Sequence, residues 1–98
     1  MNADGMWNIT VDTPMGKTEA VLALETDGGR VTGTSTSEGT THTVEDGRIE
    51  GGRMLFSVKV RKPIPVRLKF DLGVDGDALA GRVKVGVFST CTVTGARL

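Results

Sequence analysis

His42 and Cys91 are the only histidine and the only cysteine of the chain, and their side chains are the best suited to proton transfer or nucleophilic attack. An imidazole exchanges protons near pH 7, so His42 is a candidate general acid or base if it points into the fold. The alternative is an exposed histidine in a threonine-rich strand. Cys91 is in phase with Val93, which predicts an inward side chain that fills space. One cysteine and one histidine are too few ligands for a metal site, and we expect no metal and no cofactor.

Binding of a small ligand is the other chemistry that the sequence suggests. Aromatic side chains would supply contact area, and small or polar side chains on the same inward faces would orient the ligand. The candidates for this site are Trp7, Ser35, His42, Phe56, Phe70 and Cys91. Trp7 has a second interpretation, as a plug of the core, because it is the only tryptophan. Gly33 and Gly81 either leave room for a ligand or allow tight strand curvature.

The candidate residues lie in segments where apolar and polar residues alternate, which is typical of half-buried β-strands. No segment keeps a helical period of 3.6 residues for three turns. We predict eight strands, over residues 6–12, 17–25, 30–36, 40–45, 53–61, 66–74, 78–85 and 87–97. Between them, Asp46-Gly47 predicts a hairpin turn, and residues 62–65, with two prolines, predict a stiff loop.

The two halves of the chain resemble each other. Residues 27–33 align with residues 75–81 at a spacing of 48, and at the same spacing Gly47 aligns with Gly95. We interpret this as two copies of a four-strand meander. Eight short antiparallel strands favour an all-β fold, a closed up-and-down barrel with an internal 4+4 pseudo-repeat, because closure leaves no free sheet edge. We expect one domain over residues 1–98.

Charge is distributed unevenly between the halves. Residues 1–50 carry nine acids and three bases, and residues 51–98 carry three acids and nine bases, so the formal charges cancel. One interpretation is a basic face for an anionic partner; the other is that the halves complement each other. A nucleic-acid surface would add exposed aromatic residues among the bases, and Phe70 lies instead in an apolar phase. We therefore expect no nucleic-acid partner.

The composition also suggests a location. A single cysteine gives no intramolecular disulfide, which favours a reducing compartment. The first residues show neither the basic nor the apolar region of a signal peptide, and no apolar run has the length of a membrane span. The sequence therefore predicts a cytoplasmic protein with no membrane partner.

Gly5-x-Trp7 at the start of the first strand and Arg97 at the end of the last form a recognisable pattern. It is similar to the calycin pattern of lipocalins, fatty-acid-binding proteins and avidins. That resemblance implies that Arg97 packs across Trp7 and helps to close the barrel. The chain also resembles a small Gly-rich β domain of hypothetical proteins and of segments attached to amidohydrolase-like enzymes, on Thr13-Pro14-Met15-Gly16 and Thr94-Gly95-Ala96-Arg97.

The leading functional hypothesis is that the barrel holds one small, mostly apolar molecule. A second hypothesis is cofactor-free isomerase, cyclase or lyase chemistry with His42 as the base. The third is a structural or assembly module with a filled interior, in which Val21, Ala23 and Leu55 would form the face of a homodimer.

Overall fold

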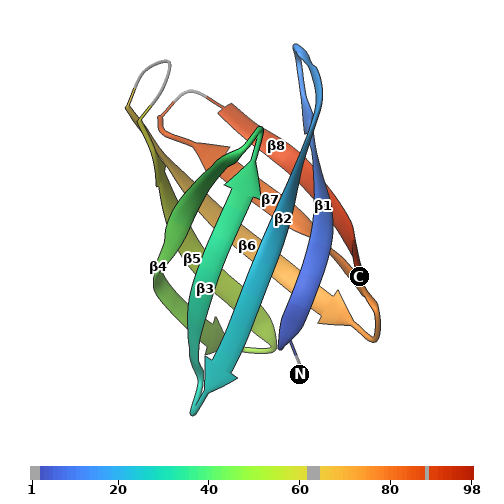
Figure 1. Ribbon diagram of the computed structural model, residues 1–98. Coiled ribbons are helices and arrows are strands. Elements are labelled where there is room, and N and C mark those ends of the chain that lie inside the picture. Colours follow the sequence, from blue (N-terminus) through green and yellow to red (C-terminus); the bar gives the residue numbers. More distant parts are fainter. Residues whose placement is uncertain (1–2, 62–64, 88) are drawn as a thin grey trace.

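Eight β-strands make up the protein in the computed structural model, which describes residues 3–61, 65–87 and 89–98. The strands are β1 (Gly5–Thr13), β2 (Gly16–Asp27), β3 (Arg30–Ser37), β4 (Thr40–Glu50), β5 (Arg53–Val60), β6 (Val66–Asp75), β7 (Ala78–Val85) and β8 (Ser89–Arg97). Every strand pairs antiparallel with its neighbours in the sequence, and β8 pairs with β1 (Figure 1). The result is the predicted closed up-and-down barrel of all-β class.

The first and last strands close the barrel along an uninterrupted register. It runs from Trp7 opposite Arg97 to Asp12 opposite Thr92. A further backbone bond, from Leu98 N–H to Met6 C=O at 2.8 Å, extends this contact, and one from Arg97 N–H to Asp77 C=O at 2.8 Å extends the pairing of β8 with β7. The two ends of the sequence therefore form one part of the wall.

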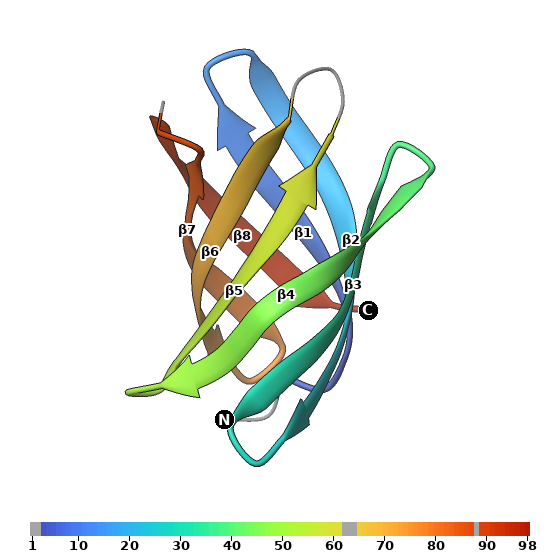
Figure 2. The ribbon, with the colours of Figure 1, turned by 90° about the vertical axis from the view of Figure 1, so that its left-hand side faces the viewer.

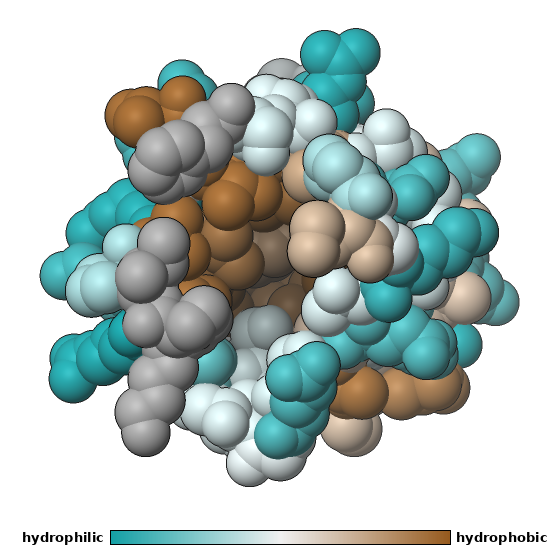
Figure 3. All heavy atoms as spheres, turned by 90° about the horizontal axis from the view of Figure 1, so that it is seen from above, coloured by the Kyte–Doolittle hydropathy of each residue, from teal (hydrophilic) through white to brown (hydrophobic). Residues whose placement is uncertain are grey.

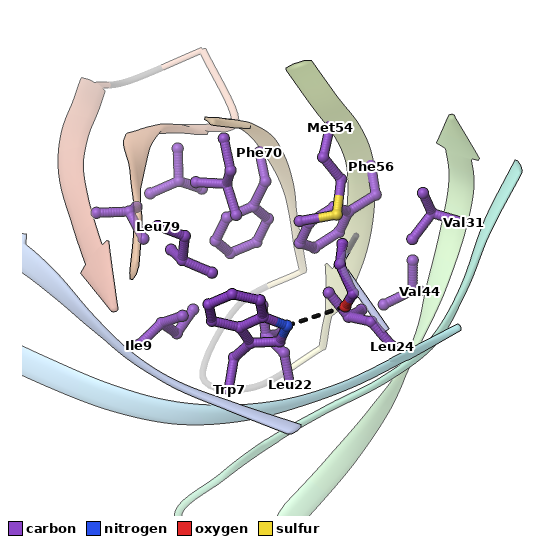
Figure 4. Close-up of a cluster of buried hydrophobic side chains, with 14 of the residues drawn as sticks. Trp7, Ile9, Leu22, Leu24, Val31, Val44, Met54, Phe56, Phe70 and Leu79 are labelled. Carbon is purple, nitrogen blue, oxygen red and sulfur yellow. Dashed lines mark hydrogen bonds between the residues drawn. The ribbon is translucent and has the colours of Figure 1, made fainter. Parts of the chain in front are cut away.

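The alternation of the sequence decides which side chains fill the interior. Period-two alternation sends successive side chains to opposite faces of a strand, so one set of each strand is enclosed when the sheet closes. In β2, β5 and β6 the enclosed set is the apolar one: Leu22, Leu24, Met54, Phe56, Val58, Phe70 and Leu72 are all buried. Phe56 and Phe70 face each other on paired strands, and their rings stack with centroids 4.7 Å apart (Figure 4).

The two ends of the barrel differ. At one end, which we call the closed end, Trp7 and Ala3 are fully buried, and the Trp7 indole N–H donates a 2.9 Å hydrogen bond to the Ala3 carbonyl (Figure 4). The other end, where β1, β3, β5 and β7 terminate, we call the mouth. Large side chains fill the closed end, so any space for a ligand lies toward the mouth.

The prediction of a hairpin at Asp46-Gly47 was wrong. Strand β4 continues through both residues to Glu50, and its register with β5 shifts between Glu45 and Arg48, which marks a β-bulge. Asp46 has a φ of 53°. A Cβ on Gly47 would lie 2.1 Å from the carbonyl oxygen of Val31, so only glycine fits this close approach. An Asp-Gly pair suits a β-bulge as well as a turn. In both structures one residue adopts a positive φ and its neighbour has no room for a side chain.

Two smaller predictions have different outcomes. The last strand begins at Ser89, later than the predicted residue 87. The predicted stiff loop over residues 62–65 lies, apart from Pro65, outside the described residues. Within the described part of the chain there is no helix of the length and apolarity required to cross a membrane.

Candidate functional site

The mouth of the barrel opens into a cavity of about 910 Å³. Its apolar lining comes from the inward faces of four strands, β1, β2, β5 and β6: Ile9, Val11, Ala20, Val58, Val60, Leu68 and Phe70. Seen from above, the hollow has apolar side chains at its base (Figure 3). Three other depressions among the described residues, of about 620, 760 and 590 Å³, are lined largely by turns and by outward-facing side chains. Of these four hollows, only the mouth cavity is lined by inward-facing apolar side chains from as many as four strands.

Ser35 and His42 place polar groups in the wall of this cavity. They lie directly opposite each other on β3 and β4, and both line the cavity. Directly opposed residues on paired strands have Cβ atoms roughly 4.5–5.5 Å apart, so one ligand can reach both side chains. Ser35 is 8% exposed and His42 is half-buried. Within the described residues no hydrogen bond involves either side chain, which leaves both available to a ligand.

The structure separates the other predicted site residues from this pair. Phe70 lines the cavity, and Phe56 lies behind it in the ring stack. Trp7 is fully buried at the closed end, and Cys91 is buried opposite Val83 without lining the cavity. Of the six candidates for ligand contact, Ser35, His42 and Phe70 are therefore brought together.

The closed end contains the contact that the Gly-x-Trp resemblance implies. The Arg97 guanidinium carbon lies 4.2 Å from the Trp7 ring centroid. Arg97 also donates hydrogen bonds to the backbone carbonyl of Asp4 and to the Asp77 carboxylate, the latter at 3.1 Å. Gly5 has a φ of 115°, and a Cβ there would lie 3.3 Å from an Arg97 nitrogen. The absence of a side chain at Gly5 leaves space for the guanidinium over the ring.

Asp4 extends this cluster to β2. Its carboxylate accepts hydrogen bonds from the hydroxyl and the backbone N–H of Thr26, at 2.7 and 2.6 Å. These two bonds favour the charged form and lower the pKa of Asp4 against the opposing effect of desolvation, and the positive charge of Arg97 lowers it further. The N-terminal segment is thereby anchored to β2 by a carboxylate that stays ionised.

Gly33 and Gly81 have a structural role away from the mouth. A Cβ on Gly33 would lie 1.9 Å from the Ala23 carbonyl oxygen, and one on Gly81 would lie 2.0 Å from that of Asp71. Neither glycine lines the mouth cavity. The geometry supports the interpretation of tight strand approach, and these glycines leave no room for a ligand.

The two residues suited to proton transfer or nucleophilic attack do not meet at the mouth. His42 and Cys91 are on β4 and β8, which do not pair, and only His42 reaches the cavity. No group of three or more metal-binding side chains gathers within the described ranges. The described residues also offer no hydrogen bond that would orient the imidazole as a base.

Charged residues at the mouth were missed as site residues. Lys59 and Arg61 line the cavity at the end of β5, and Glu38 and Glu45 line it from the β3–β4 side. In the sequence, Lys59 and Arg61 belong to the basic residues of the second half. Nothing in the sequence distinguishes these two from the bases that face outward on the barrel wall. The place of these charged residues at the cavity follows from where β5 ends and where the β3–β4 turn lies at the mouth, which alternation along a strand does not specify.

The two interpretations of the charge asymmetry can be compared with the ion pairs. The ion pair of Arg67 with Asp46, at 3.6 Å, joins the two halves of the chain, whereas Arg48 with Glu50, Arg53 with Asp71 and Arg97 with Asp77 each lie within one half. The proposed dimer face is also divided, because Val21 and Ala23 lie on β2 and Leu55 lies on β5, with β3 and β4 between them.

Comparison with known proteins adds no family to this description: no protein-family model and no curated protein matches the chain.

Proposed function

We propose that the protein binds one small, mostly apolar molecule in the mouth of the barrel. The observation that carries the proposal is the 910 Å³ cavity with apolar walls and two opposed polar side chains, Ser35 and His42. Ligand sites in proteins combine a mostly apolar pocket of roughly 300–1,000 Å³ with a few polar groups that fix orientation. The resemblance to the calycin pattern supports the same function.

The cavity suggests how the ligand would be held. Ile9, Leu68 and Phe70 would contact its apolar body, and burial of that surface would supply most of the binding free energy. Ser35 and His42 would pair with one polar group of the ligand, whose position would set its orientation. Trp7 would have no direct contact, so its fluorescence is a poor reporter of binding.

A dye that becomes fluorescent in apolar sites, anilinonaphthalene sulfonate, tests the proposal. The Ala20→Phe variant places a ring in the cavity, and Ala80→Phe, on the exposed face of β7, is the matched control. We expect dye binding to the wild type and to Ala80→Phe, and none to Ala20→Phe.

A second readout does not depend on the folding of a variant. With bound dye, methyl resonances of Val11 and Leu68 at the mouth should shift, and those of Leu24 and Val31, which do not line the cavity, should stay in place. Absence of saturable dye binding to the wild type, or shifts confined to Leu24 and Val31, would overturn the proposal.

A further inference from the structure

The wall of the barrel is split between β4 and β5 at the mouth. Their register ends at Val44 opposite Val58, although β4 begins at Thr40 and β5 continues to Val60. The two strands diverge toward the mouth (Figure 2). The mouth cavity reaches the outer surface here, because its lining includes Thr41 and Thr43 of β4. We call this opening the β4–β5 split.

The β4 side of the split presents backbone hydrogen-bonding groups. Strands β3 and β4 are joined by two residues with positive φ, Glu38 at 51° and Gly39 at 79°, the combination of a type I′ hairpin. In such a hairpin the residues that flank the turn, Ser37 and Thr40, form a hydrogen-bonded pair. Along the ladder, non-hydrogen-bonded and hydrogen-bonded pairs then alternate. The backbone N–H groups of Thr41 and Thr43 therefore point away from β3 and into the split.

The β5 side is built in the same way. The β4–β5 hairpin also has two central residues with positive φ, Gly51 and Gly52, so the flanking residue Arg53 directs its backbone groups toward β4. Because the direction of the backbone groups alternates along a strand, the backbone N–H and C=O of Lys59 also point toward β4. The split is thus bordered by two strand edges, and free strand edges are templates for the addition of another strand.

Side chains around the split define the chemistry of an added strand. Val58 and Val60 line the cavity on the inner side. On the outer side, Lys59 and Arg61 are exposed, and neither takes part in an ion pair between described residues. A strand in this position would place alternate side chains in an apolar cavity and the others beside two cations.

We propose that the β4–β5 split binds an extended peptide segment of a partner protein, with alternating apolar and acidic residues, as an added strand on the edge of β4. The backbone of the peptide pairs with Thr41 and Thr43. Its apolar side chains enter the mouth cavity, and its acidic side chains lie beside Lys59 and Arg61. A second copy of this chain is a poorer match, because its own free edge, Thr41, His42 and Thr43, does not alternate apolar with acidic residues.

Hydrogen exchange of backbone amides provides a test with internal controls. The probe is a capped heptapeptide of alternating glutamate and valine. Without the peptide, the amides of Thr41 and Thr43 should exchange rapidly, and those of Thr40 and His42, bonded to β3, slowly. At a peptide concentration ~10 times its Kd, exchange at Thr41 and Thr43 should slow by about tenfold, with Thr40 and His42 unchanged. No slowing at millimolar peptide overturns the proposal.

Control peptides and variants separate strand addition from other binding. A glutamate–valine peptide that is N-methylated at alternate residues keeps its side chains but loses backbone donors, and it should not protect Thr41 or Thr43. Lys59→Glu should weaken binding of this probe and favour a lysine–valine peptide, and Lys84→Glu on the outer face of β7 should do neither. Protection of Thr41 that depends on protein concentration without peptide would identify the split as a contact between copies and overturn the proposal.

Discussion

The barrel has two seams that join its first four strands to its last four, and they close to different extents. At the β8–β1 seam, six consecutive pairs run without a shift from Trp7 opposite Arg97 to Asp12 opposite Thr92. At the β4–β5 seam, five pairs are interrupted by a bulge and end at Val44 opposite Val58. One seam is reinforced by a cation over an aromatic ring, and the other opens into the mouth cavity.

The difference between the seams originates at one point of β4. Gly47 and Gly95 occupy similar positions, since each lies opposite an apolar residue of the preceding strand, Val31 or Leu79. Gly95 continues straight into its pairing with Ile9 of β1. At Gly47 the chain bulges, and the registers of β4 with both β3 and β5 shift there; toward the mouth β4 keeps two pairs with β5, ending at Val44 opposite Val58, while its pairing with β3 continues to Thr40. A bulge increases local twist and redirects a strand, which is consistent with the divergence of β4 from β5 two pairs further toward the mouth.

Removal of Trp7 should produce the largest difference in stability between the two seams. Trp7→Ala should lower the free energy of unfolding by about 3–5 kcal/mol, because it deletes a fully buried ring and the surface under Arg97. Met54→Ala is the matched change at the β4–β5 seam, where Met54 lies opposite Ile49. It should lower the free energy of unfolding by less than Trp7→Ala does. Urea unfolding measures both. A cost below ~1 kcal/mol for Trp7→Ala would contradict its role as the anchor of the closed end.

Substitution of the two glycines addresses the bulge itself. Gly47→Ala should cost ~1–3 kcal/mol, because the new Cβ would lie 2.1 Å from a backbone oxygen and the strands must separate. Gly95→Ala meets its nearest backbone oxygen, that of Asn8, at 2.8 Å, and should cost less. Thermal unfolding of both variants gives the comparison. If Gly95→Ala lost as much stability as Gly47→Ala or more, the strands would not approach each other more closely at the bulge than at Gly95.

The sequence was informative wherever a period-two pattern determined the structure. Eight strands and their inward faces follow from alternation, and the contact of Arg97 with Trp7 is the one that the resemblance to the calycin pattern implied. The bulge was missed because Asp46-Gly47 satisfies a hairpin and a bulge equally well, and only the register with β5 distinguishes them. The position of Trp7 far from the mouth was missed for a related reason: alternation specifies inward or outward, but it does not specify depth along the barrel axis.

Loss of the arginine at the β8–β1 seam should have a moderate effect. Arg97→Met keeps most of the aliphatic length but removes the cation over Trp7 and the hydrogen bond to the Asp4 carbonyl, so we expect a loss of about 1–2 kcal/mol. Arg53→Met is the control, because Arg53 forms an exposed ion pair with Asp71 that should contribute only ~0–1 kcal/mol. Chemical denaturation at low and high salt measures both. Equal losses would show that the position over the ring adds nothing.

Acid titration of the closed end should give the smallest effect. The pKa of Asp4 is lowered mainly by the hydrogen bonds from Thr26, so its stabilising effect is complete above the ordinary aspartate range and disappears as pH falls through the lowered pKa. The difference in free energy of unfolding between wild type and Asp4→Ala should therefore be widest near neutral pH and narrow below about pH 4.

The cause of that shift can be tested separately from its consequence. Thr26→Val removes the hydroxyl donor and leaves the backbone N–H, so part of the preference for the charged form is lost. In an NMR titration of the Asp4 carboxyl group, the pKa in Thr26→Val should rise toward the ordinary value while remaining below it. An unchanged pKa would leave the Thr26 backbone N–H and Arg97 as the causes, and a raised pKa in Arg97→Met would then assign the shift to Arg97. Either result identifies whether β2 or β8 holds the N-terminal segment that covers the closed end, an anchor for which the mouth has no counterpart among the described residues.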